Sequence, residues 1–173
     1  TTSLQIAGGR PTENKLRTRC VDQKDPERNI SWVLQCSWLS GIEQAAAPDP
    51  RVKAVVAVSP PLRLLFDATS FKSLSAKVLL VSGTRDWVVP SGPEAIRPMR
   101  DTGAVRMGHR LVLVNGADHF NLRSFRGEER PALIGPVLLA WLNEQLGEDG
   151  SVTFSGGGWG DNEGRLVDVS GSL

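Results

Sequence analysis

Three short apolar runs, rich in β-branched residues, are the strongest constraint on the fold of this chain. They cover residues 51–61, 77–83 and 109–116. Apolar residues at consecutive positions, without polar alternation, are typical of strands buried on both faces of a parallel sheet. Residues 91–100 form a predicted short helix between the second and third runs, which makes a strand–helix–strand crossover. We therefore predict an α/β fold.

The N-terminal part of the chain is expected to be helical. Residues 1–10 are interpreted as the last turns of a helix that starts upstream, since small apolar residues are followed by two glycines and a proline. Thr1 is not preceded by an initiator Met or a signal-peptide pattern, and we interpret it as a cut. Residues 11–50 are a predicted helical insertion, because apolar positions over residues 30–39 recur at spacings of three and four.

The C-terminal part has one clear helix and an ambiguous tail. Residues 131–147 are predicted to be an amphipathic helix that completes a core of residues 51–147. The Gly-rich tail, residues 148–173, alternates in polarity at residues 151–154 and 165–169, which fits either a small hairpin or a mobile segment. Doubly wound sheets usually have five or more strands, so we expect further strands upstream.

Composition excludes several classes of partner. The chain has 20 Lys and Arg against 19 Asp and Glu, a net charge of +1 that gives no long-range attraction for nucleic acid. No apolar run approaches the roughly 20 residues of a membrane span. No clustered Cys and His residues indicate a metal site.

Two cysteines, Cys20 and Cys36, are separated by 15 residues. A disulfide between them would stabilise the fold by about 3 kcal/mol in the chain-entropy model. Such a bond favours a secreted or periplasmic location, whereas two reduced, buried thiols would fit a cytosolic protein. We predict the disulfide.

The residues with catalytic potential follow the second and third apolar runs. In an open α/β sheet, functional groups lie just beyond the carboxyl ends of the strands. Asp86 follows the second run and His119 follows the third, 33 residues later. This spacing lets a carboxylate hold the imidazole Nδ1–H and leave Nε2 free to accept a proton. We predict Asp86 and His119 to be an acid and base pair.

Neighbouring residues offer alternatives. Asp118 is adjacent to His119, but adjacent side chains point apart, so we prefer Asp86 as the acid. His109 begins the third run within a charged segment and is predicted to be solvated. Trp87 and Phe120 flank the acid and the base, where they either wall a substrate pocket or fill the core.

The two loops resemble a known family. Residues 83–90 (GTRDWVVP) and 116–121 (GADHFN) are similar to the acid and histidine loops of α/β-hydrolases. Residues 19–37 and 49–56 resemble the predicted dienelactone-hydrolase group. That group is similar in turn to platelet-activating-factor acetylhydrolases and cutinase-like polyester hydrolases. The resemblance covers residues 1–146.

This resemblance implies ester hydrolysis by a Ser, His and Asp triad, with no cofactor. It implies that Asp86 and His119 belong to the triad and that the insertion, with Trp32 and Trp38, is a lid over the active site. Asp67 is a competing acid, since some acetylhydrolases take their acid from that region. The chain would thus be the C-terminal portion of a doubly wound α/β-hydrolase sheet with a helical lid insertion.

The chain departs from the family at the nucleophile. Gly-x-Ser-x-Gly occurs nowhere in its 173 residues. The N-terminal half of the same hydrolase, as a separate or missing polypeptide, is the expected source of the Ser, a few residues before Thr1. The alternative is a non-catalytic binding or scaffold domain derived from the fold. A free N-terminal Thr1 can itself act as a nucleophile, but the strand–helix–strand pattern is wrong for the folds that do so.

Overall fold

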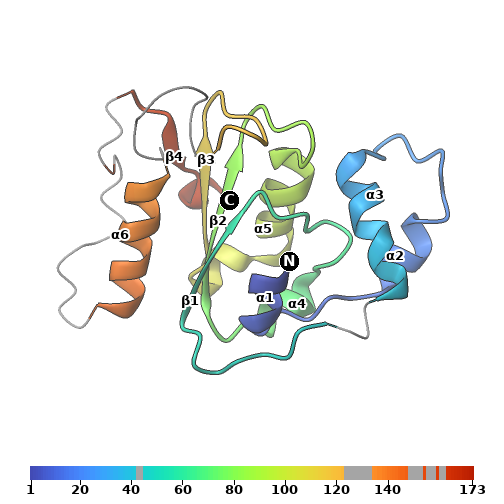
Figure 1. Ribbon diagram of the computed structural model, residues 1–173, viewed down its shortest axis with the longest axis horizontal. Coiled ribbons are helices and arrows are strands. Elements are labelled where there is room, and N and C mark those ends of the chain that lie inside the picture. Colours follow the sequence, from blue (N-terminus) through green and yellow to red (C-terminus); the bar gives the residue numbers. More distant parts are fainter. Residues whose placement is uncertain (42–44, 123–133, 148–153, 155–158, 160–162) are drawn as a thin grey trace.

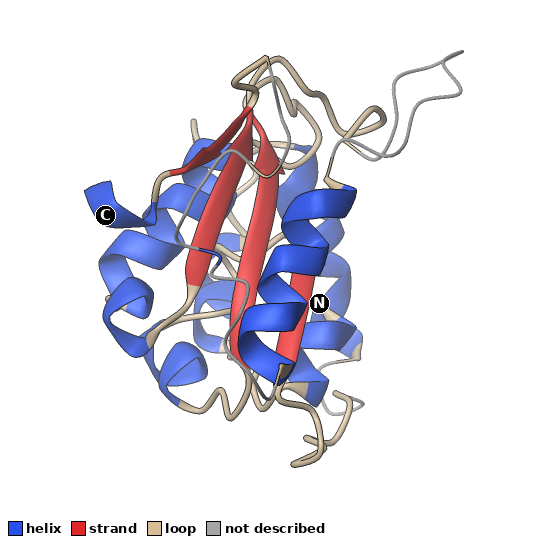
Figure 2. Ribbon diagram, turned by 90° about the vertical axis from the view of Figure 1, so that its left-hand side faces the viewer, coloured by secondary structure: helices blue, strands red, loops and turns tan. Residues whose placement is uncertain are grey.

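The structure is a computed structural model that describes residues 1–41, 45–122, 134–147, 154, 159 and 163–173. A four-stranded mixed sheet forms its centre, in the order β1-β2-β3-β4 (Figures 1 and 2). The strands are β1 (Ala54–Val58), β2 (Lys77–Gly83), β3 (Arg110–Val114) and β4 (Leu166–Asp168). The first three are mutually parallel, and β4 is antiparallel to β3. The α/β class predicted from the sequence is confirmed.

The described helices are mostly short. They are α1 (Thr2–Ile6), α2 (Asn14–Arg19), α3 (Ile30–Cys36), α4 (Ala68–Lys72), α5 (Arg97–Thr102) and α6 (Gly135–Leu146), with the single turns η1 (Ser37–Ser40), η3 (Gly92–Ile96), η4 (Ala104–Met107) and η6 (Ser170–Ser172). The helix expected over residues 91–100 is divided into the π-helical turn η3 and α5. The helix expected over residues 131–147 is α6, and residues 131–133 lie outside the described residues. Within the described residues, no helix is long and apolar enough to cross a membrane.

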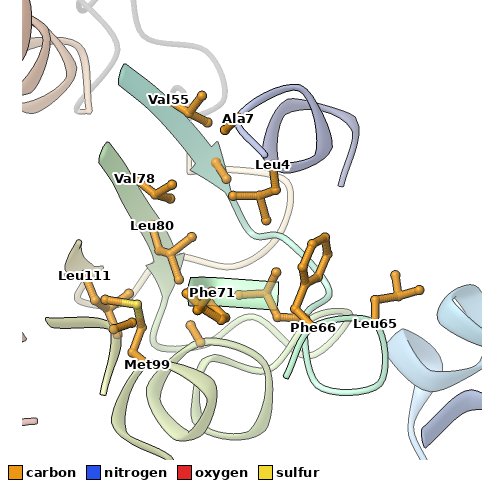
Figure 3. Close-up of a cluster of buried hydrophobic side chains, with 14 of the residues drawn as sticks. Leu4, Ala7, Val55, Leu65, Phe66, Phe71, Val78, Leu80, Met99 and Leu111 are labelled. Carbon is orange, nitrogen blue, oxygen red and sulfur yellow. The ribbon is translucent and has the colours of Figure 1, made fainter. Parts of the chain in front are cut away.

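Both faces of the central strand β2 are buried, as the continuous apolar run predicts. Val78 and Leu80 pack on one face, in a core shared with α1, α4 and α5 (Figure 3). Leu79 and Val81 pack on the other face, against α6. Figure 1 shows α6 alone on one side of the sheet and α1, α4 and α5 on the opposite side. The parallel strands β1, β2 and β3 have their carboxyl ends at the same edge of this sheet.

The insertion is helical and is joined by the predicted disulfide. Cys20 and Cys36 are bonded, which connects the end of α2 to the end of α3. Trp32 of α3 is fully buried, and the guanidinium groups of Arg19 and Arg63 lie 5.9 and 5.3 Å from its ring. The insertion therefore packs its own aromatic residue against the segment that follows β1.

The described end of the tail pairs with β3, with Leu166 opposite Val114. Residues 151–153, the other half of the possible hairpin, lie outside the described residues, so the hairpin stays a prediction.

One sequence expectation is corrected by the structure. His109, predicted to be solvated, is only 3% exposed, and its Nδ1 accepts a hydrogen bond from Val78 N at 3.2 Å. Its ring lies edge-on to Phe71 of α4. Burial lowers the pKa of His109 to about 4, with a smaller contribution from the nearby Lys77 cation.

Candidate active site

Three polar side chains follow three neighbouring strands at the same edge of the sheet. Ser59 follows β1, Asp86 lies in the loop after β2, and His119 lies in the loop after β3. Parallel strands bring their carboxyl ends together at one edge, and Figure 1 shows the loops after β2 and β3 side by side there. The sheet order therefore places Asp86 between the other two residues.

The Asp86 carboxylate accepts four hydrogen bonds. Its Oδ2 lies 2.9 Å from Nδ1 of His119 and accepts the Ser59 hydroxyl at 2.8 Å. Its Oδ1 accepts the backbone N–H groups of Val88 and Val89 at 3.0 and 2.7 Å. The side chain of Asp86 has no exposed surface. These donors replace the water that burial removes and fix the orientation of the carboxylate.

This contact determines the tautomer in which a neutral His119 can act. With Nδ1–H donated to Asp86, Nε2 carries the lone pair. The side chain of His119 is 32% exposed, and none of the residues described here forms a hydrogen bond with its Nε2. The geometry is that of a general base held by an orienting acid.

The acid and histidine loops are held close together by backbone contacts. Arg85 N donates to Ala117 O at 2.9 Å, and Gly116 N donates to the Thr84 hydroxyl at 2.9 Å. A Cβ atom on Gly83 would collide with the carbonyl oxygen of Ala117, so this close approach requires glycine.

The alternative acids serve other purposes. Asp118 accepts the backbone N–H groups of Phe120 and Asn121 at 2.8 and 3.0 Å, which shapes the histidine loop. Asp67 caps α4 by accepting Ser70 N at 3.0 Å. Neither carboxylate is among the described partners of His119.

A cavity of about 280 Å³ adjoins the base, lined by Val58, Ser59, His119, Phe120 and Leu122. Phe120 is 65% exposed and Trp87 is 59% exposed, with 6.2 Å between their ring centroids. Both are thus surface residues, and the core-filling interpretation is wrong. The Phe120 ring also lies edge-on to His119, with centroids 5.6 Å apart.

A larger cavity of about 460 Å³ lies elsewhere, between the insertion and the core, with Arg63, Asp67 and Arg97 in its lining. Arg63 and Arg97 both form ion pairs with Glu27. Glu27 thus holds both guanidinium groups in place. The smaller cavity is the better candidate for chemistry, because it contains the His119 imidazole that Asp86 holds. Among the residues described, no cluster of three or more His, Cys, Asp or Glu side chains could hold a metal ion.

Comparison of this chain with protein-family models, with curated proteins and with solved structures finds no match. The function of the site therefore has to be inferred from its own residues. The geometry can orient an imidazole, accept a proton at Nε2 and return that proton to a leaving group.

Ser59 was not among the site residues predicted from the sequence. Its signal was a polar residue directly after a buried strand, at the edge where Asp86 and His119 were expected. Its backbone has φ of +44°, which places this non-glycine residue in the left-handed region. Backbone strain of this kind often accompanies functional sites.

Proposed function

We propose that this chain carries the general base and the orienting acid of a serine ester hydrolase of the α/β-hydrolase type. The single observation that carries the proposal is the 2.9 Å contact between His119 Nδ1 and the buried Asp86 at neighbouring strand ends. A nucleophilic Ser and an oxyanion hole would come from an N-terminal segment of the same hydrolase, because these 173 residues lack Gly-x-Ser-x-Gly.

In the proposed reaction, His119 Nε2 takes the proton of the Ser hydroxyl as the Ser oxygen attacks the ester carbonyl. The resulting imidazolium, held by Asp86, donates this proton to the departing alkoxide, which leaves as an alcohol. An acyl-enzyme remains. Water then attacks it with the same proton transfers in turn, which releases the acid and restores the Ser. No cofactor is needed for these steps.

Ser59 does not have the geometry of this nucleophile. Its hydroxyl donates to Asp86 Oδ2, whereas a triad Ser donates to Nε2 of the base. We assign Phe120 and Trp87 to the wall of the substrate site, because both are exposed and Phe120 lines the cavity at His119. The insertion containing α2 and α3 would be the lid, and its disulfide supports a secreted or periplasmic enzyme.

The test is labelling with a fluorophosphonate, a reagent for activated Ser, together with an aryl-ester assay on material purified from its native source. Intact-mass measurement would identify every polypeptide present. We expect the label on a segment that contains Gly-x-Ser-x-Gly, and we expect His119→Ala to lower kcat by about a thousandfold or more. Arg85→Ala, which changes an exposed side chain of the acid loop, is the matched control and should retain most of the activity.

The absence of a labelled nucleophile would contradict the proposed function. If the chain is folded, alone and unlabelled, the alternative of a non-catalytic binding or scaffold domain is correct. Activity that survives His119→Ala would also contradict the proposal.

A further inference from the structure

Ser59 is a polar neighbour of Asp86 whose role the proposed mechanism leaves open. It is 7% exposed, and its N–H donates to Val81 O at 2.8 Å, which continues the pairing of β1 with β2. Among the described residues, only Trp159 shares its positive φ without being glycine. The left-handed conformation costs a residue such as Ser about 1 kcal/mol. The fold therefore retains a strained residue at this position.

The hydroxyl of Ser59 competes with His119 for one atom. Ser59 Oγ and His119 Nδ1 lie 2.8 and 2.9 Å from the same Oδ2 of Asp86. A hydrogen-bond donor on a carboxylate oxygen withdraws negative charge from it, so the oxygen attracts a second donor less strongly. Because Asp86 is buried, water does not screen this effect.

We infer that Ser59 is a positioning residue, which holds Oδ2 of Asp86 between β1 and β3 and weakens its attraction for the His119 imidazolium. The catalytic importance of this role rests on the proposed function. The coupling between the Ser59 hydroxyl and His119 through Asp86 is a property of the folded chain, whatever its function. Removing the hydroxyl should leave more negative charge for His119 and favour its protonated form. In a hydrolase, Ser59 would thereby fix the oxygen against which the base is held.

The test is an NMR titration of the His119 ring in the 173-residue chain. The chain has two His residues, so His109→Asn provides a background with a single ring signal. Ser59→Ala removes the hydroxyl and keeps the strain, whereas Ser59→Gly removes both. We expect the titration midpoint of His119 to rise by about 0.5 to 1 pH unit in both variants, the size that a neutral hydrogen bond implies.

Two comparisons separate this role from a structural one. Ser59→Gly should be more stable than Ser59→Ala because strain is relieved, yet both should raise the midpoint equally. Ser70→Ala removes another buried hydroxyl, bonded to Arg10 O and remote from the site, and should leave the midpoint unchanged. An unchanged or lowered midpoint in the Ser59 variants would overturn the inference.

The titration needs neither substrate nor a second polypeptide, so its result is independent of the proposed function. A raised midpoint without esterase activity in any preparation would contradict the proposed function but support the coupling between Ser59 and His119. An active hydrolase whose Ser59 variants keep the wild-type titration midpoint would support the proposed function and contradict the role of Ser59.

Discussion

At the scale of single residues, burial and hydrogen-bond partners decide the behaviour of the two histidines. His119 is partly exposed and is held by a buried carboxylate. His109 is buried, accepts a backbone N–H and lies near the cation of Lys77. From the sequence, His119 was predicted to be held by Asp86, but His109 was predicted to be solvated. The residues that bury His109, Val78 and Phe71, are distant from it in the chain.

His109 should make the fold sensitive to acid. Burial lowers its pKa from 6.5 to about 4, so the folded state favours the neutral ring. This contribution to stability is complete above pH 6.5 and is lost as the pH falls toward 4. We expect a loss of about 2 kcal/mol in the free energy of unfolding between pH 7.5 and pH 5. Urea denaturation at both pH values measures it.

The control for this prediction is His109→Asn, which keeps an acceptor for Val78 N but does not titrate. The variant should lose less stability than the wild type over the same pH range. Equal losses in the two proteins would show that His109 is not responsible.

At the scale of elements, a buried acid joins the insertion to the core. Glu94 of η3 has no exposed surface, and its Oε2 accepts Leu62 N, Arg63 N and Gln35 Nε2 at 2.9, 3.0 and 3.1 Å. Gln35 belongs to α3, and its Oε1 accepts Leu64 N at 2.8 Å. The other carboxylate oxygen of Glu94 has no hydrogen-bond partner among the described residues. Desolvation therefore raises the pKa of Glu94 despite its three donors.

This raised pKa predicts the opposite pH dependence from that of His109. The folded state binds the Glu94 proton more tightly than the unfolded state, so its contribution is present below pH 4.5 and is lost as the pH rises through the folded pKa. Glu94→Gln keeps the shape and an acceptor without the charge. We expect this variant to gain stability relative to the wild type as the pH rises from 4.5 to 8, measured by urea midpoints.

Glu27→Gln is the matched comparison, because it removes an acid with the opposite shift. The pKa of Glu27 is lowered by its hydrogen bonds to Arg97 and Arg63, so any stability it adds is lost toward acid pH. Glu94→Gln and wild-type curves that stay parallel across the range would contradict the assignment to Glu94.

At the scale of the whole molecule, the disulfide is the covalent tie between the two helices of the insertion. It closes a loop with a sequence separation of 16, and both cysteines pack against the core cluster that includes the buried Trp32. Replacing Cys20 and Cys36 together by Ala should lower the free energy of unfolding by about 3 kcal/mol. Trp fluorescence during urea denaturation measures this loss.

Reduction offers the control for this prediction. Dithiothreitol should destabilise the wild-type protein to a similar extent and leave the double variant unchanged. A double variant as stable as the oxidised wild type would mean that packing around Trp32 alone holds the insertion.

The sequence by itself determined the α/β class, the three parallel strands and the disulfide. Continuous apolar runs and paired cysteines are local signals, and each has few structural outcomes. The positions of Asp86 and His119 at neighbouring strand ends also followed from chain order. Only the tertiary structure decided that β4 pairs with β3, that His109 is buried and that Ser59 shares a carboxylate oxygen with His119. These features depend on contacts between residues far apart in sequence, which no local pattern specifies.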